Sequence, residues 1–169
     1  MSQLSFSSFD TALMVRDAQG RYALASADQI LDAARQAIDQ KMPRGASCSS
    51  PAAVRAYLCA KLAGLEHEVF AVLFLDAHHR LIEYVEMFRG TVDGASVHPR
   101  EVVKEALRFN AVAVIVAHNH PSGVPDPSAA DEAMTRRLKE ALALVDVRTL
   151  DHIIVAGNTT MSFSERGLI

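Results

Sequence analysis

Two uninterrupted apolar segments most constrain how this chain can fold. Residues 69–75 read VFAVLFL and residues 111–117 read AVAVIVA, so neither segment alternates between apolar and polar side chains. A strand with one face in water alternates in this way, whereas a strand covered on both faces does not need to. Each segment therefore predicts a central strand, and together they predict a sheet with other elements packed on both faces.

The segments around these two runs predict helices and outer strands. Ser50 is a favourable capping residue and Pro51 suits the first helical position, so a helix is expected to begin there. Apolar spacing and turn residues give the remaining elements, namely helices over 51–63, 99–109 and 129–144 and strands over 80–88, 148–156 and 160–163. The order α-β-β-α-β-α-β-β predicts an α/β fold in which helices flank a sheet.

The N-terminal part of the chain reads as a separate segment. Residues 11–25 predict a hairpin around Gly20, which can adopt the positive φ of a tight turn, and residues 27–41 predict a helix. The stretch 43–51 is rich in Pro, Gly and Ser and reads as a linker. We therefore expect an accessory segment over 1–49 and a main domain over 50–169.

The composition narrows the range of functions. Half of the residues are hydrophobic and the formal net charge is −3, so no basic excess supports nucleic-acid binding. Cys48 and Cys59 do not form a CxxC pair, and we expect both to be reduced thiols. The N-terminus lacks the pattern of a signal peptide, and no apolar run approaches the roughly 20 residues that span a bilayer. These features predict a cytoplasmic protein without a membrane partner.

The segment after the second apolar run carries potential metal ligands. His118 and His120 are two residues apart, and residues i and i+2 of an extended chain project to the same side. Both imidazoles can therefore face one ion, with Asn119 turned away. A loop rich in Pro and Gly then leads to a helix that begins near Ser128, which places Asp131 in its first turn. Two histidines and one carboxylate leave a fourth tetrahedral position for water, so we predict one catalytic Zn²⁺ per chain on His118, His120 and Asp131.

A hydrolytic zinc site also needs a group that accepts and returns protons. Glu68 stands at the start of a buried strand, where a carboxylate has little structural reason to be, and we predict that it activates the water. Glu66 competes for this role, because both carboxylates lie on the same side if the strand already begins at residue 66. Spacing alone does not separate the two.

Part of this pattern also has a purely structural interpretation. Ser128 and Asp131 fit an ordinary helix start, in which Ser128 accepts a backbone hydrogen bond and Asp131 lies at the positive end of the helix dipole. This interpretation does not explain two histidines directly upstream, at the end of a buried strand. Asp151 and His152 precede another buried strand, and we expect them either beside the site or as a hydrogen-bonded strand end.

These residues resemble the motif of a known metalloprotease family. His118-x-His120-Pro121, then Ser128-x-x-Asp131, with an upstream glutamate, is similar to the JAMM motif of MPN-domain metalloproteases. The surrounding sequence is closer still to the RadC-like branch. The resemblance covers about residues 50–169 and is carried by the segments 88–91, 97–102, 117–123, 151–155 and 162–168.

The resemblance implies an MPN-like (cytidine-deaminase-like) mixed sheet flanked by helices, with zinc on His118, His120 and Asp131. It also implies a glutamate general acid and base, which maps to Glu68, and a serine that stabilises an oxyanion, which maps to Ser128. The implied activity is hydrolysis of a peptide or isopeptide bond in a peptide or protein substrate that the sequence does not identify.

A second function stays open beside this one. RadC-like proteins usually carry a helix-hairpin-helix segment before this domain, but residues 1–49 show no Gly-containing hairpin between two helices. The alternative to a protease is a non-catalytic, metal-containing binding module linked to DNA repair or nucleic-acid processing.

Overall fold

The computed structural model describes residues 13–90 and 97–169, and the chain divides into two compact units, Met1–Ala37 and Ile38–Ile169. In the first unit, β1 (Met14–Arg16) and β2 (Tyr22–Leu24) pair as an antiparallel hairpin, and α1 (Ala27–Lys41) begins after them. The φ of Gly20, in the hairpin turn, is 82°. The predicted hairpin and helix are confirmed, except that residues 11 and 12 of the hairpin lie outside the described residues.

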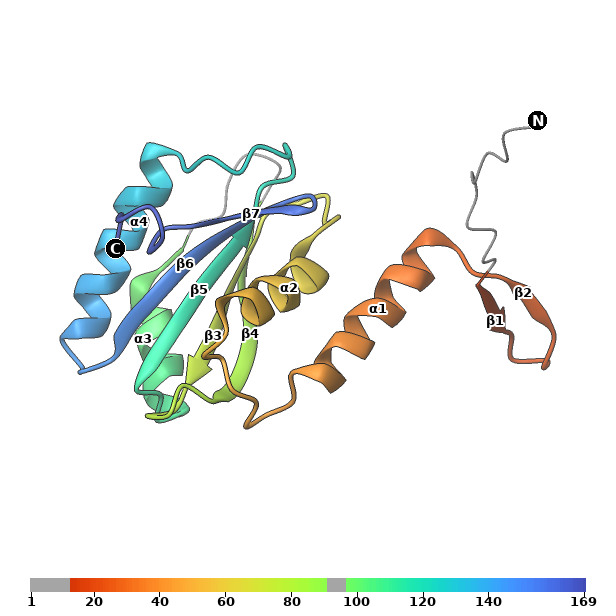
Figure 1. The fold of residues 1–169 in the computed structure, drawn as a ribbon, viewed down its shortest axis with the longest axis horizontal. Helices are drawn as coiled ribbons and strands as arrows, with labels where there is room; N and C mark the ends of the chain where they lie inside the picture. Colours follow the sequence, from red (N-terminus) through yellow and green to blue (C-terminus); the bar gives the residue numbers. More distant parts are fainter. Residues whose placement is uncertain (1–12, 91–96) are drawn as a thin grey trace, which may run out of the picture. The chain divides into compact units, whose positions relative to one another are not determined.

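A five-stranded sheet organises the second unit. Its strands lie in the order β4-β3-β5-β6-β7, with β5 and β6 parallel and the other neighbours antiparallel (Figure 1). The elements are α2 (Pro51–Leu62), β3 (Val69–Leu75), β4 (Leu81–Arg89), α3 (Pro99–Arg108), β5 (Ala113–Asn119), α4 (Ala129–Ala143), β6 (Arg148–Ala156) and β7 (Thr159–Ser162). The order of elements and the α/β class are those predicted from the sequence.

Side chains that alternate along β3 pack into two separate cores. The odd-numbered residues of this strand pack with α2 on one face of the sheet, and the even-numbered residues pack with α3 and α4 on the other. Phe70 and Phe74 are fully buried among the second set, where each contributes about 1.5–3 kcal/mol relative to an exposed position. Coverage on both faces explains why the run is apolar throughout, as predicted.

The stretch 43–51 packs against the edge of the sheet. Gly45 N–H donates to the Leu81 carbonyl at 2.7 Å, and Leu81 N–H donates to the Ala46 carbonyl at 2.8 Å. Cys48 is buried in the core on the α2 side. The segment that reads as a linker by composition is therefore ordered by backbone pairing with the start of β4. The domain boundary expected there stays a prediction.

β5 extends beyond the apolar run that predicted it. The strand begins at Ala113 rather than residue 111 and continues through His118 and Asn119. Its ladder continues because His118 pairs with Phe70 on β3, and both polar residues pair with β6. The strand predicted from the apolar pattern ended at Ala117. An apolar pattern cannot predict the burial of polar side chains, because their burial depends on partners from other segments.

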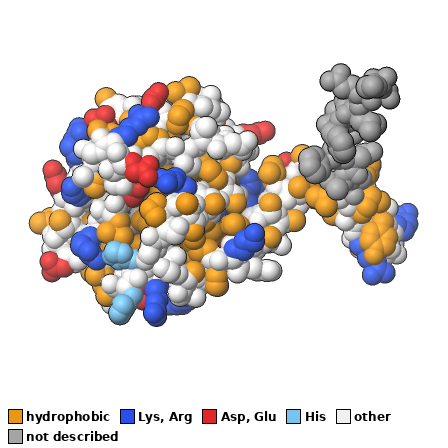
Figure 2. Space-filling view, viewed as in Figure 1, with side chains coloured by type: hydrophobic (Ala, Val, Ile, Leu, Met, Phe, Trp, Pro, Cys, Tyr) orange, Lys and Arg blue, Asp and Glu red, His pale blue; other side chains and the backbone are white. Residues whose placement is uncertain are grey.

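Charged side chains of both signs are interspersed on the face of the second unit that Figure 2 shows. Lys and Arg are not gathered there into one basic region. Within residues 13–90 and 97–169, no helix combines the length and apolarity that a membrane crossing requires. Cys48 and Cys59 are free thiols.

Candidate metal centre

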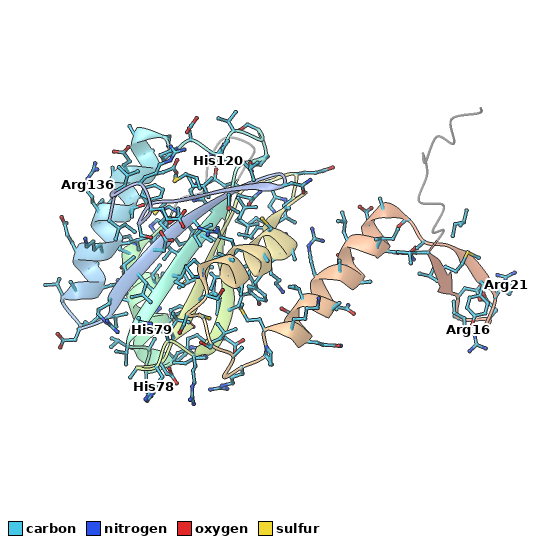
Figure 3. The ribbon with its side chains drawn as sticks, viewed as in Figure 1. Arg16, Arg21, His78, His79, His120 and Arg136 are labelled. Carbon is cyan, nitrogen blue, oxygen red and sulfur yellow. The ribbon has the colours of Figure 1, made fainter. Side chains whose placement is uncertain are left out.

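Three side chains converge at the C-terminal end of β5. His118 is the penultimate residue of that strand, His120 follows it, and Asp131 lies in the first turn of α4. One potential ligand atom of each side chain lies within 4.8 Å of those of the other two. In Figure 3, His120 lies at the end of the sheet opposite His78 and His79. This group of two imidazoles and one carboxylate could hold a metal ion.

Alternation along β5 separates the imidazoles from the Asn119 amide. Val116, two residues before His118, packs in the core that α3 and α4 cover, whereas Ala117 packs in the core on the α2 side. Asn119, two residues after Ala117, is hydrogen-bonded to His67 and to Val69, the first residue of β3. The rings of His118 and His120 approach each other, with their Nε2 atoms 2.9 Å apart. Two histidines on one side with Asn119 turned away is the arrangement that the sequence predicts.

Hydrogen bonds determine which ring nitrogens face the group. His120 Nδ1 lies 2.7 Å from the Val124 carbonyl oxygen. A carbonyl oxygen only accepts, so Nδ1 carries a hydrogen and Nε2 of the neutral ring keeps its lone pair. His118 Nδ1 is hydrogen-bonded to Nε2 of His152 at 2.8 Å, which leaves His118 Nε2 facing the group as well.

The Asp131 carboxylate completes the group. Its Oδ1 lies 3.3 Å from His118 Nε2, and its Oδ2 lies 3.6 Å from His120 Nε2. Two imidazole nitrogens this close to each other and to a carboxylate need positive charge between them, from a proton in the metal-free protein or from a metal ion. Two nitrogen donors and one carboxylate oxygen are a donor set that zinc accepts, so the residues present fit the implied metal.

The pKa values of the side chains at the centre favour the binding of a cation. Hydrogen bonding with Asp131 raises the pKa of His120, although burial acts in the opposite direction. Burial works to raise the pKa of Asp131, but hydrogen bonds from His118, His120 and Ser128 outweigh it and hold that pKa well below its usual range. Burial, together with the charge of His118, lowers the pKa of His152 well below its usual value. Asp131 therefore stays anionic beside the two candidate ligands.

Glu68 and Glu66 occupy different surroundings. β3 begins at Val69, so strand alternation does not reach back to residue 66. Glu66 lies in a bend and is exposed, whereas Glu68 is half-buried. The Glu68 carboxylate also raises the pKa of His120, by a smaller amount than the hydrogen bond with Asp131 does. Glu68 is therefore near enough to the centre for its charge to act on His120.

Asn119 holds the backbone on both sides of Glu68. Its Oδ1 accepts a hydrogen bond from Val69 N–H at 2.8 Å, and its Nδ2 donates to the His67 carbonyl at 3.0 Å. Asn119 is only 3% exposed. The residue between the two histidines is thereby joined to the segment that carries the candidate base. This role of Asn119 could not be predicted from the sequence, because its partners are 50 and 52 residues away.

Ser128 and Asp131 form a capping box at the start of α4. Ser128 Oγ accepts from Asp131 N–H at 3.1 Å, and Asp131 Oδ2 accepts from Ser128 N–H at 2.7 Å. The Ser128 hydroxyl also donates to Oδ2 at 2.6 Å. The helix-start interpretation is confirmed, and the same carboxylate also faces the two histidines. The oxyanion role of Ser128 stays a prediction.

Asp151 and His152 have separate environments. The Asp151 carboxylate accepts hydrogen bonds from Ser162 Oγ at 2.6 Å and from Ser164 N–H at 3.0 Å, and so holds the turn after β7. His152 is fully buried and contacts His118. Both residues lie inside β6 (Arg148–Ala156), so the expectation that they precede the strand is wrong. Asp151 is hydrogen-bonded to Ser162 and Ser164, whereas His152 lies beside the site.

Thr135 also lies near the centre, although the sequence did not predict it there. Its Oγ1 lies 2.6 Å from His152 Nδ1 and donates to the Asp131 carbonyl at 2.6 Å. Its position four residues after Asp131 was the available signal, because residues i and i+4 share one face of a helix.

Known proteins resemble this chain over most of its length. The family described as RadC-like JAB domain matches residues 48–168. A UPF0758 protein of Vibrio cholerae is 58% identical over 139 residues, which cover 82% of this chain and 87% of that protein. A UPF0758 protein of Thioalkalivibrio sulfidiphilus is 53% identical, over 89% of this chain and 67% of that protein. One of Nitrosococcus oceani is 57% identical, over 82% of this chain and 62% of that protein. Together with the geometry at the end of β5, these matches show that the chain belongs to the RadC-like JAB domain family.

Proposed function

We propose that this chain is a zinc-dependent metallopeptidase-type hydrolase that cleaves a peptide or isopeptide bond. The observation that carries the proposal is the convergence of two imidazole Nε2 atoms and the Asp131 carboxylate. Structural zinc sites use four protein ligands, whereas a site with three leaves a position for water. Within the described part of the chain, no fourth His, Cys, Asp or Glu joins the group.

Each side chain has a task in the proposed reaction. His118, His120 and Asp131 would hold the zinc, which would supply polarisation of the substrate carbonyl and would lower the pKa of water from about 15.7 towards about 7. Glu68 would accept the proton of the attacking water and return it to the leaving amine, and its half-buried position limits exchange with solvent. The Ser128 hydroxyl would turn from Asp131 Oδ2 to donate to the oxyanion.

The position of Glu68 favours hydrolysis over binding alone. A binding module needs the three metal ligands but not a proton carrier beside them. The two Asn119 hydrogen bonds restrain the backbone next to Glu68, which would serve a reaction that depends on where its carboxylate lies.

Metal content is the first test. Purified wild-type protein is expected to contain about one equivalent of zinc, as a three-ligand site implies, and the His118→Ala/His120→Ala double variant none. Wild-type protein that is folded but takes up no added zinc would overturn the proposal, because the histidines would then be structural.

Cleavage is the second test, with peptide and isopeptide libraries as substrates. Glu68→Gln should keep its zinc and lose at least about 100-fold in rate, while Glu66→Gln is the matched control and should cleave like wild type. Ser128→Ala should also slow cleavage, by about 100-fold or more. If zinc-loaded wild type cleaves nothing, yet it and Glu68→Gln retain the same partner, the chain is a binding module.

A further inference from the structure

We propose that His152 and Thr135 are positioning residues that fix the Nε2 lone pair of His118 towards the metal. The inference rests on the metal centre proposed above. It is carried by three consecutive hydrogen bonds, from His118 to His152, from His152 to Thr135 and from Thr135 to the Asp131 backbone carbonyl. This relay begins at one proposed ligand on β5 and ends at another on α4.

The acceptor at the end of the relay sets the direction of the first two bonds. The Asp131 carbonyl oxygen can only accept, so the Thr135 hydroxyl, 2.6 Å away, donates to it. That bond uses the one hydroxyl hydrogen. His152 Nδ1, also 2.6 Å from Thr135 Oγ1, must therefore carry a hydrogen and donate it.

The third bond follows from the state of the His152 ring. The ring is fully buried, and its partners are a hydroxyl and another imidazole rather than a carboxylate, so a charged ring would be costly. A neutral ring with its hydrogen on Nδ1 has a lone pair on Nε2, which accepts from His118 Nδ1–H at 2.8 Å. His118 then presents the lone pair of Nε2, which lies 3.3 Å from Asp131 Oδ1.

Aromatic packing holds the His152 ring in this orientation. Phe163 stacks on the ring with centroids 4.5 Å apart and planes at 20°, and Phe70 approaches edge-on at 6.0 Å. Both ring nitrogens are hydrogen-bonded, so a ring rotation would break two bonds in the interior. Thr135 is equally confined, at 1% exposure.

The relay therefore arranges the centre before any metal binds. It joins β5, β6 and α4, and it ties the helical turn that carries Asp131 to the strand that carries His118. Partners that orient ligand histidines typically change metal affinity by about 10- to 100-fold when they are removed. We expect this dependence for His152 directly and for Thr135 through His152.

The hydrogen positions can be measured in the wild-type protein without metal. Long-range ¹H–¹⁵N correlation spectra show which nitrogen of each imidazole carries a hydrogen. We expect Nδ1–H in both His118 and His152. A His118 ring whose Nδ1 carries no hydrogen would overturn the relay. This measurement uses neither zinc nor substrate, so it decides the relay separately from the proposed function.

Thr135→Val tests the function of the relay, because it removes the hydroxyl and keeps the shape. Zinc affinity, measured by competition with a chelator, should fall roughly tenfold, and Thr135→Ser should restore it to within about threefold. Thr149→Val is the matched control. It removes a buried hydroxyl on β6 that has no hydrogen-bond partner among the described residues, and it should leave the affinity unchanged.

His152→Phe should have a larger effect, because it keeps an aromatic ring next to Phe163 but removes the acceptor for His118. Zinc affinity should fall by about 10- to 100-fold. Folded Thr135→Val and His152→Phe proteins that both bind zinc like Thr149→Val would contradict the proposal. If the variants do not fold, the wild-type spectra still decide it. A wild type that binds no zinc would refute the proposed function instead.

Discussion

The starts of α1 and α4 carry the same local motif in different surroundings. At α1, Ser26 Oγ accepts from Gln29 N–H at 3.2 Å, and Gln29 Oε1 accepts from Ser26 N–H at 2.9 Å. At α4, Ser128 and Asp131 form the same reciprocal pair. The Gln29 amide completes its box in an exposed position, whereas the Asp131 carboxylate is half-buried and also faces two imidazoles.

The surroundings of the two boxes, rather than the boxes themselves, determine whether a capping side chain could also bind a metal ion. Either side chain can satisfy an unpaired N–H of a first helical turn, so the cap alone does not require a charge. What distinguishes the α4 box is the end of β5 opposite it, which supplies two ring nitrogens. The capping function and the proposed ligand function of Asp131 can therefore be separated by experiment.

Asp131→Asn should have the largest effect, since it makes the α4 box chemically like the α1 box. Asparagine keeps an oxygen that can complete the cap but lacks the negative charge, so zinc affinity should fall by about 100-fold or more. Chelator competition measures the change. Gln29→Glu is the reciprocal control: it places a carboxylate in the α1 box, and in the Asp131→Asn background it should restore no zinc binding. Wild-type affinity in Asp131→Asn would show that the carboxylate is only a cap.

Metal removal should lower the stability of the second unit. A ligand that binds only the folded state stabilises it by about 2.7 kcal/mol when its concentration is 100 times its dissociation constant. Urea unfolding with zinc should therefore show a higher midpoint than unfolding with EDTA. The His118→Ala/His120→Ala variant should give the same midpoint in both. An equal zinc effect in that variant would place the bound metal elsewhere.

Asn119→Ala should separate the metal ligands from the candidate base. It leaves the buried N–H of Val69 without its acceptor, which should cost about 1–3 kcal/mol of folding free energy. Zinc affinity should stay within about threefold of wild type, while cleavage should fall as it does in Glu68→Gln. Asn158→Ala, at an exposed turn, is the matched control and should change neither. Loss of zinc in folded Asn119→Ala would assign Asn119 to the ligands instead.

Much of the fold could be predicted because burial on both faces leaves uninterrupted apolar runs such as 69–75. The end of β5 could not, since the burial of His118 and Asn119 depends on partners from other segments. The order of the stretch 43–51 could not be predicted either, because backbone hydrogen bonds to the start of β4 hold it in place and these leave no apolar pattern in the sequence.

The same physical limit applies to the candidate site. His118, His120 and Asp131 could be predicted as a group because strand alternation and a helix start bring them together locally. Glu68 could be predicted from its place at the start of a buried strand and from the resemblance, but spacing did not separate it from Glu66 until the start of β3 was known. Thr135 and Asn119 belong to residue types that are common everywhere, and only their long-range partners mark them.

The raised pKa of His120 predicts how zinc binding depends on pH. Because the pKa of His120 is raised in the folded protein, its proton stabilises the metal-free fold fully when the pH is below the ordinary histidine pKa of about 6.5. This stabilisation is lost as the pH rises through the pKa of the folded protein. Zinc must displace this proton, so its affinity should increase with pH, by up to about tenfold per unit, and level off above the raised pKa. In the Asp131→Asn variant, zinc affinity should level off at a lower pH, because the hydrogen bond that raises the pKa of His120 is weakened. A flat wild-type profile would contradict the assignment of His120 as a ligand.

Ser26→Ala and Ser128→Ala should have the smallest effects on stability, and together they compare the two boxes directly. Each removes a capping acceptor, which typically costs about 1 kcal/mol. In Ser26→Ala the loss should be confined to faster amide hydrogen exchange in the first turn of α1, with zinc affinity unchanged. Ser128→Ala also removes the 2.6 Å hydrogen bond that orients Asp131 Oδ2, so zinc affinity should fall by about 3- to 10-fold. If both substitutions cost the same stability and neither changes zinc affinity, the orientation of the Asp131 carboxylate owes nothing to Ser128, and the α4 box is a cap in the same sense as the α1 box.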